Sequence, residues 1–123
     1  MNEELNRVLR ECMMVFEELE DLEVRVCYKP LRKGVLGQTR VKKQLVRSRG
    51  KRRFAWRPII EVSSSLGEVR DPLKKRELLR YVLVHELVHL SRNHLNRPRG
   101  KEHEDDFELE VRERLRRLQN IVK

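Results

Sequence analysis

The pattern of apolar positions predicts a helix at each end of the chain. In residues 3–20, apolar side chains recur three and four positions apart, and Asn2 stands where an N-cap is expected. We therefore expect one amphipathic helix over this whole segment. Residues 101–121 show the same spacing and predict a last helix. The apolar stripe of that helix comprises Phe107, Val111, Leu115, Leu118 and, just beyond it, Val122.

Alternating apolar and polar positions predict three strands between these helices. The first is residues 22–29, where apolar side chains alternate with charged or small ones. Two further runs, 38–47 and 52–63, flank the turn sequence SRGK and predict a β-hairpin. Pro58 in the second run favours an edge position or a strand end, because proline cannot donate a ladder hydrogen bond. Residues 63–72, SSSLGEVRDP, then predict a loop.

A third predicted helix runs over residues 72–93. Asp71 is its expected N-cap and Pro72 its first residue, a position that tolerates proline. Its second half is apolar nearly all the way round, so we expect it to be buried on more than one side. The predicted fold is a small single α+β domain spanning residues 1–123. It consists of an N-terminal helix, a three-stranded mostly antiparallel sheet, this central helix and a C-terminal helix packed on it.

Composition indicates a folded protein with a heavily solvated surface. Hydrophobic residues make up 38% of the chain and charged residues 40%, a balance typical of thermophilic proteins. The polar start MNEELNR is not typical of a signal peptide, and no apolar run approaches the roughly 20 residues that cross a bilayer. Two cysteines are too few for a disulfide framework or a Cys₄ zinc ribbon. We expect a cytoplasmic monomer with reduced thiols and no membrane partner.

Positive charge is concentrated in one segment. The net charge is +9, and residues 24–60 hold thirteen of the 29 Lys and Arg residues but no Asp or Glu. A solvated strand face is the simpler explanation of a charge run, but thirteen basic residues without an acid favour binding to the phosphates of DNA or RNA. The residues that we expect to contact nucleic acid are Arg47, Arg49, Lys51, Arg52, Arg53 and Trp56.

The central predicted helix carries the strongest chemical signal, in the sequence HELVH. At 3.6 residues per turn, His85 and His89 project from one helical face and can share a zinc ion. Glu86 lies about 100° around the helix axis. From there it can reach a zinc-bound water and act as general base, as in the HExxH motif. Two core histidines are the simpler alternative, but that arrangement would leave a buried Glu86 uncompensated.

A catalytic zinc site needs a third protein ligand, and the candidates after His89 are His94, Glu102, His103, Glu104 and Glu108. At about 100° per residue from Phe107, His103 falls at about −40° and Glu104 at about +60°. Both positions lie on or beside the apolar stripe, so both stay open. Glu102, at about 220°, points to solvent, and His94 would require the motif helix to end sharply.

HELVH followed by HEDDF, residues 103–107, resembles the SprT-like metallopeptidases and their YgjP relatives. Those families carry HExxH and then a third ligand histidine in an HxxxF pattern, and the resemblance extends to the N-terminal helix and the hairpin. It implies that His103 is the third ligand and that substrates include proteins attached to DNA. Glu104 replaces their usual glycine, and the zinc ribbon of many members is absent. The same residues also resemble the minimal gluzincins, which implies Glu104 as ligand with Glu108 behind it.

These patterns predict a zinc-dependent metallopeptidase with one Zn²⁺ per chain. His85, His89 and His103 would hold the metal, and Glu86 would activate water to hydrolyse a peptide or protein substrate, including nucleic-acid-associated proteins. We expect the substrate to lie extended along an edge strand at residues 57–63. The alternative is a nucleic-acid-binding protein whose zinc site is vestigial or regulatory.

Overall fold

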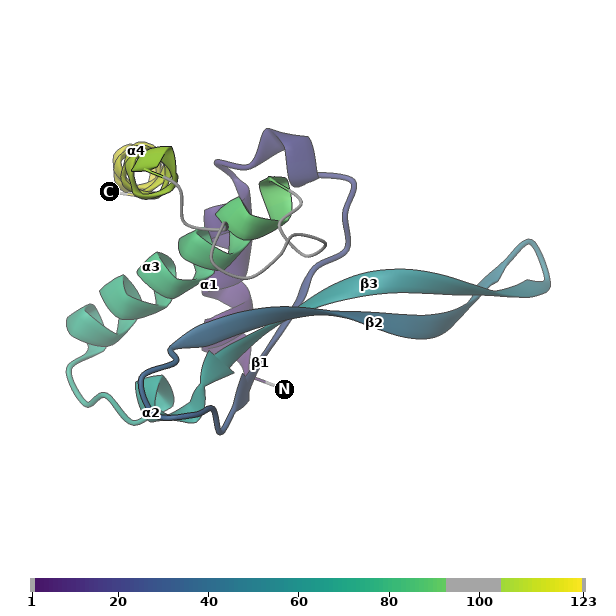
Figure 1. Cartoon of the computed structure of the whole chain (residues 1–123), viewed down its shortest axis with the longest axis horizontal. Coiled ribbons are helices and arrows are strands. Elements are labelled where there is room, and N and C mark those ends of the chain that lie inside the picture. The colour runs from purple at the N-terminus through teal and green to yellow at the C-terminus, as the bar shows by residue number, and fades with distance from the viewer. Residues whose placement is uncertain (1, 93–104, 123) are drawn as a thin grey trace.

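The computed structural model describes residues 2–92 and 105–122, except for the side chains of Ser48, Trp56 and Asp105. Figure 1 shows a helical body from which a long β-hairpin projects. In chain order the elements are α1 (Glu3–Met13), the 3₁₀ helix η1 (Glu17–Leu19), β1 (Arg25–Lys29), β2 (Gly37–Ser48), β3 (Lys51–Ser63), α2 (Ser64–Gly67), α3 (Pro72–Ser91) and α4 (Asp105–Ile121).

The strands form a mixed sheet, so the prediction of a mostly antiparallel three-stranded sheet is wrong. Within the described residues the strand order is β1-β3-β2. The β2–β3 hairpin is antiparallel as expected, but β1 pairs with β3 in parallel, from Arg25 opposite Ile59 to Lys29 opposite Ser63. The strand with the most apolar segment, β3, lies in the centre, where Ile60 is fully buried. The coarser α+β class is confirmed, because helices and strands occupy separate parts of the chain.

Pro58 lies where β3 changes from two partners to one. It is opposite Val41 of β2, and the pairing with β1 begins only at the next residue, Ile59. Because β3 has no β1 partner at this position, the missing N–H of proline removes no hydrogen bond from that side of the ladder. The expectation of an edge position was therefore right for this one residue and wrong for the strand as a whole.

The prediction of one helix over residues 3–20 is also wrong, since α1 ends at Met13. The chain continues in tighter turns, in which the amides of Val15 and Phe16 donate to carbonyls three residues back, at 3.2 and 3.0 Å. Both side chains are fully buried. A 3₁₀ turn has three residues and an α-helical turn has 3.6, so both place residues i and i+3 on the same side. The spacing of apolar residues therefore could not distinguish a 3₁₀ turn from a continued α-helix. Downstream, residues 64–67 form the short helix α2 inside the predicted loop.

Caps fix the starts of the two long helices that precede the undescribed segment. The Asn2 side chain accepts a hydrogen bond from the amide of Leu5 at 2.8 Å. Asp71 accepts from the amides of Leu73 and Lys74, at 3.0 and 3.4 Å. Both caps were predicted, and both satisfy backbone donors that a helix start leaves open.

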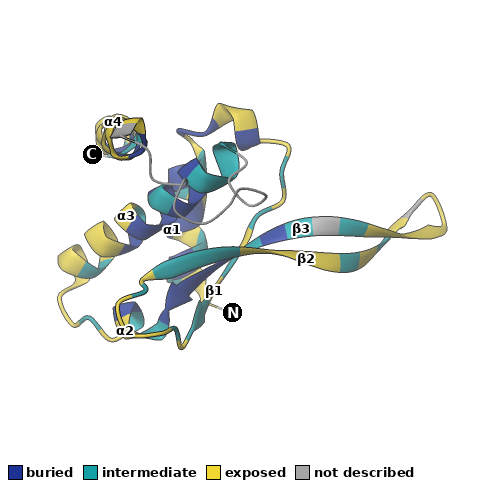
Figure 2. Ribbon diagram, viewed as in Figure 1, coloured by how far each residue is buried: buried dark blue, intermediate teal, exposed yellow. Residues whose placement is uncertain are grey.

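The core lies around α3, which contacts α1, α4 and the sheet. Figure 2 shows its second half buried, with exposed positions gathered in its first turns. Six of seven consecutive residues are buried there, so the expectation of a central helix is confirmed. From α4, the predicted stripe contributes three fully buried side chains, Phe107, Val111 and Leu118. Among the described helices, none is long and apolar enough to cross a membrane.

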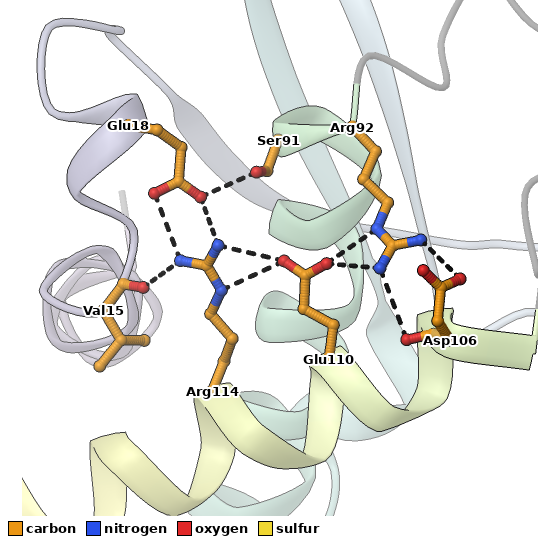
Figure 3. A network of polar contacts seen from close by, with 7 residues as sticks. All are labelled: Val15, Glu18, Ser91, Arg92, Asp106, Glu110 and Arg114. Atoms are coloured by element: carbon orange, nitrogen blue, oxygen red, sulfur yellow. Dashed lines mark hydrogen bonds and ion pairs between the residues drawn. The ribbon is translucent and has the colours of Figure 1, made fainter.

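Charged side chains fasten α4 to the rest of the body (Figure 3). Glu110 accepts hydrogen bonds from Arg92 at the end of α3, at 2.6 and 2.8 Å, and from Arg114 on its own helix. Arg114 also donates to Glu18 and to the backbone carbonyl of Val15. Its guanidinium carbon lies 4.3 Å from the centre of the Phe16 ring. One arginine thus satisfies the carbonyl that the early end of α1 leaves open and joins α4 to η1.

Replacing Arg114 tests this connection. Its side chain is only 15% exposed, and Arg114→Gln deprives the backbone carbonyl of the buried Val15 and the partly buried carboxylate of Glu110 of their donor. We expect the free energy of unfolding to fall by about 1–3 kcal/mol. Arg116 is the matched control, because it forms a similar ion pair with Glu113 on the same helix but is 70% exposed. Arg116→Gln should leave the denaturation midpoint unchanged. Equal losses in the two variants, measured by urea unfolding, would contradict the assigned role.

Candidate metal centre

The end of α3 brings the motif residues together as predicted. His85 and His89 are four residues apart on this helix, and their ring centroids lie 4.9 Å apart. Ligand atoms from His85, Glu86 and His89 all lie within 4.8 Å of one another. Both histidines are partly exposed, whereas Glu86 is buried. This cluster is close enough to hold a metal ion, and its two imidazoles and carboxylate are the donor types that zinc accepts.

Glu86 is held by a contact from the sheet. Its Oε1 accepts a hydrogen bond of 2.8 Å from the Thr39 hydroxyl of β2. Burial raises the pKa of the Glu86 carboxyl to about 7, although the Thr39 hydrogen bond acts in the opposite direction. A carboxyl group with a pKa near neutrality can both accept and return a proton, which a general base requires.

A glycine at the start of β2 permits this approach between strand and helix. A Cβ atom built on Gly37 would lie 2.6 Å from Cγ1 of Val82 and 3.5 Å from Cγ of Glu86. Val82 and Glu86 are one helical turn apart, so they present one face of α3 to the strand. The absence of a side chain at Gly37 therefore sets how closely β2 can pack on the motif helix.

Residues of α4 and α3 surround the two histidines on the other side. The Phe107 ring packs against both, with centroid distances of 5.0 Å to His85 and 4.4 Å to His89. Oε1 of Glu108 lies 3.9 Å from Nδ1 of His85. Tyr81, one turn before His85, has its ring centroid 6.0 Å away. At 3.9 Å the Glu108 carboxylate is a neighbour of His85 beyond hydrogen-bond length, and the contact is an ion pair only when the imidazole is protonated.

A pocket of about 310 Å³ opens beside the motif. The segment before β2 and one face of α3 form its walls. Its lining comprises Gly34, Val35, Leu36, Gly37, Tyr81, Val82, His85 and Glu86. The first histidine and the buried carboxylate therefore face a largely apolar space that is large enough for a side chain.

Of the candidates for a third ligand, Glu108 is described and lies beside His85. The other four lie outside the described residues: His103 and Glu104, the two favoured positions, and His94 and Glu102. The choice between His103 and Glu104 therefore stays a prediction. Phe107, the last residue of the HxxxF pattern, is described and packs on the histidine pair.

The predicted nucleic-acid residues lie on the hairpin, away from the motif. Arg47 is opposite Arg52, and Val46 is opposite Arg53. Arg49 lies in the turn between the strands, and Lys51 begins β3. Trp56 is opposite Lys43 in the register, and its side chain is outside the description. The structure thus places these residues together on one projecting element, separate from the metal cluster (Figure 1).

Thr39 and Gly37 were not predicted as site residues. A threonine in an alternating strand and a glycine before a strand are common, so neither carries a signal of its own. Their role follows from the pairing of Thr39 with Ile60 and of Gly37 with Val62, which places the start of β2 beside the centre of the sheet. Only the three-dimensional packing of β2 on α3 makes them part of the site.

Comparison with known proteins identifies no relative. No protein-family model, curated protein or solved structure matches this chain. The resemblance to the SprT-like and gluzincin metallopeptidases therefore remains a prediction from the motif residues.

Gly37→Ala tests the close approach of β2 to α3. The new methyl group would overlap Val82, so strand and helix must separate, and we expect a loss of about 1–3 kcal/mol in unfolding free energy. Val82→Ala removes the overlapping Cγ1 atom and is the matched second change. The double variant should be more stable than the sum of the two single effects predicts, as a double-mutant cycle measures. Strictly additive changes in unfolding free energy would show that the side chains at positions 37 and 82 are not in contact.

Proposed function

We propose that this protein is a zinc-dependent metallopeptidase. The observation that carries the proposal is the geometry of the motif. Two histidines on one helical face adjoin a buried glutamate whose carboxylate is held by Thr39 and whose pKa is raised to about 7. A purely structural role for this cluster would not require a carboxyl group whose pKa lies near 7 beside two imidazoles that can bind metal.

The donor set fits zinc. His85 and His89 would each supply one nitrogen, and the third ligand is His103 by our preferred assignment, with Glu104 as the alternative. When bound, zinc would polarise the scissile carbonyl and lower the pKa of water at the site. The Glu108 carboxylate, 3.9 Å from Nδ1 of His85, would have to move closer to hydrogen-bond that imidazole and hold its orientation.

Glu86 would transfer the proton. Its carboxylate removes a proton from the water whose oxygen attacks the carbonyl carbon, and then delivers that proton to the leaving amine as the C–N bond breaks. Thr39 keeps the carboxylate in place through its hydroxyl. Burial maintains a high pKa in the free protein, and a bound dication would lower it through its positive charge.

The substrate strand must be assigned differently from the sequence prediction. Residues 57–63 were expected to form the edge that binds an extended peptide, but residues 59–62 of β3 are paired on both sides. Within the described sheet, the strand with a free edge near the motif is β2, which carries Gly37 and Thr39 beside Glu86. An extended peptide would therefore add to the start of β2, with its backbone amides and carbonyls bonded to that edge.

The apolar pocket supports a preference in the substrate. Val35, Leu36 and Val82 line a space next to His85 and Glu86. A peptide bound along β2 would place one side chain there, close to the bond being cut. We propose that this side chain is apolar, because a charged group would lose hydration without gaining a partner.

The alternative function, a nucleic-acid-binding protein with a vestigial or regulatory zinc site, is favoured by one observation. The basic residues gather on the projecting hairpin and not around the motif. One protein can have both functions, but only the metallopeptidase function depends on Glu86.

Metal content and turnover test the proposal together. The purified protein, reconstituted with zinc, should hold one equivalent per chain, and either His85→Ala or His89→Ala should remove it. Glu86→Gln should retain zinc, since it alters the proton acceptor and not the imidazoles. It should lower turnover of an unstructured protein substrate by roughly 100-fold or more.

Thr39→Val serves as the intermediate variant. It removes the hydroxyl that bonds Glu86 and leaves the metal donors unchanged, so we expect normal zinc content with reduced turnover. A wild-type protein that binds no zinc after reconstitution would exclude the proposal. If the wild-type protein binds zinc yet cleaves substrate no faster than Glu86→Gln, at a rate that does not depend on the metal, the result would favour the nucleic-acid-binding protein with a vestigial or regulatory zinc site.

The third ligand can be assigned by a matched pair of substitutions. If the histidine is the ligand, His103→Ala should lose most zinc affinity, whereas Glu104→Ala should change it little. A competition titration with a chromogenic chelator measures both. The reverse ranking would make Glu104 the ligand and move the protein toward the gluzincin arrangement.

A further inference from the structure

The β2–β3 hairpin extends well beyond the three-stranded part of the sheet. We call residues 41–58 the arm, because β1 pairs with β3 only from Ile59 onward. Figure 1 shows the arm projecting from the body as a twisted two-stranded ribbon, and Figure 2 shows that most of its described positions are exposed. A two-stranded ribbon without a packed face contributes little to a fold. Its length therefore calls for another explanation.

Basic side chains cover the arm, and few of them are neutralised. At its base, Arg57 forms an ion pair with Glu23. Just before the arm, Arg40 lies 3.0 Å from the buried Glu61, so this charge is compensated within the sheet. Among the described residues, no carboxylate pairs with Lys42, which is opposite Arg57, or with Arg47, Arg52 and Arg53 farther out. Within the described part of the chain, these four side chains are therefore positive charges without an ion-pair partner.

One face of the arm also exposes apolar side chains. Leu45 is opposite Phe54, and the two are 54% and 62% exposed. The Lys43 Nζ atom lies 4.3 Å from the centre of the Phe54 ring, and Arg47 and Arg52 form the next cross-strand pair on this face. An aromatic ring is therefore open to solvent and bordered by cations along the ribbon.

The turn contains an arginine in an unfavourable backbone conformation. Arg49 and Gly50 have φ values of 53° and 76°, both positive as a two-residue type I′ turn requires. Asn or Gly is the usual residue at the first of these positions, because other side chains are strained there. An exposed arginine that is kept in a strained position at the tip is consistent with a binding role.

We propose that the arm binds single-stranded nucleic acid. Uncompensated Lys and Arg side chains would contact successive phosphates, and the exposed Phe54 ring would stack on an unpaired base. A duplex would satisfy the charges but has its bases already stacked, so it leaves the ring unused. An acidic peptide would likewise make no use of a ring bordered by cations. The combination of charge and an open aromatic face favours a single strand.

This binding is independent of the metal centre. The arm projects from the body that carries the motif (Figure 1), so a change of the Glu86 side chain should not affect binding to the arm. Glu86→Gln protein should bind nucleic acid as wild type does. Failure of the peptidase proposal would therefore leave this one intact, and the two can be judged separately.

Fluorescence anisotropy with labelled oligo(dT) and oligo(U), a matched DNA duplex and poly-glutamate tests the proposal on the full chain. We expect the single strands to bind more tightly than the duplex, and poly-glutamate to bind weakly. The affinity for single strands should fall steeply with salt, with a log–log slope of about −0.7 per phosphate contact.

Three variants separate charge from stacking. A triple reversal of unpaired arm residues, two of them on the Phe54 face, Arg47→Glu, Arg52→Glu and Arg53→Glu, should abolish binding. Its control reverses three exposed residues of the helices, Lys74, Arg76 and Arg117, and lowers the net charge by the same amount. The control should retain nearly all affinity. Phe54→Leu keeps an apolar side chain but removes the ring, so it should weaken single-strand binding roughly tenfold and leave duplex binding unchanged.

Arg49→Asn provides a variant that should fold at least as well as wild type. Asparagine tolerates a positive φ, so the melting temperature should be equal or higher, while single-strand affinity falls. No binding to single strands at low salt would overturn the proposal, as would equal loss in the control triple. Equal affinity for poly-glutamate would instead indicate an acidic protein partner. Duplex binding as tight as single-strand binding, unaffected by Phe54→Leu, would overturn the single-strand assignment.

Discussion

The burial of one carboxylate within the contact between α3 and β2 constrains the rest of this structure. An ionisable group in an apolar helix is costly unless a polar partner reaches it, and here Thr39 does so. That partner can reach Glu86 only because Gly37, two residues earlier, allows the strand to approach the helix. The hairpin register places both residues beside the helix, and the pocket next to the motif lies along the same contact, with Gly37, Val82 and Glu86 in its lining.

The opposite side of α3 is held by a different kind of contact. Phe107 packs on the two histidines, and the charged side chains around Glu110 and Arg114 hold α4 against the end of α3 and against η1. The apolar stripe of α4 sets which face turns inward, whereas the guanidinium groups set its position along α3. Because directional hydrogen bonds fix register more tightly than apolar contact does, the histidine rings are kept in a defined environment.

Local features could be predicted from the sequence, but strand order could not. The caps at Asn2 and Asp71, the hairpin turn and the motif spacing depend on neighbouring residues, and each is found where expected. The parallel pairing of β1 with β3 depends on segments some thirty residues apart, and alternation in β1 is the same for either direction. The end of α1 was missed because tight turns preserve the apolar spacing. Thr39 and Gly37 gained their roles only through packing.

A single strand, β2, carries both the residues beside Glu86 and one side of the arm. Ser48 lies nine residues after Thr39, so the turn is about 30 Å along the strand from the residue that contacts Glu86, at roughly 3.3 Å per residue. The length of the strand therefore sets the distance between the hairpin turn and the pocket beside the motif. The right-handed twist of the ribbon sets which of its sides faces back toward the body. Shortening the hairpin by a pair of residues on each strand would change that distance without altering the pocket.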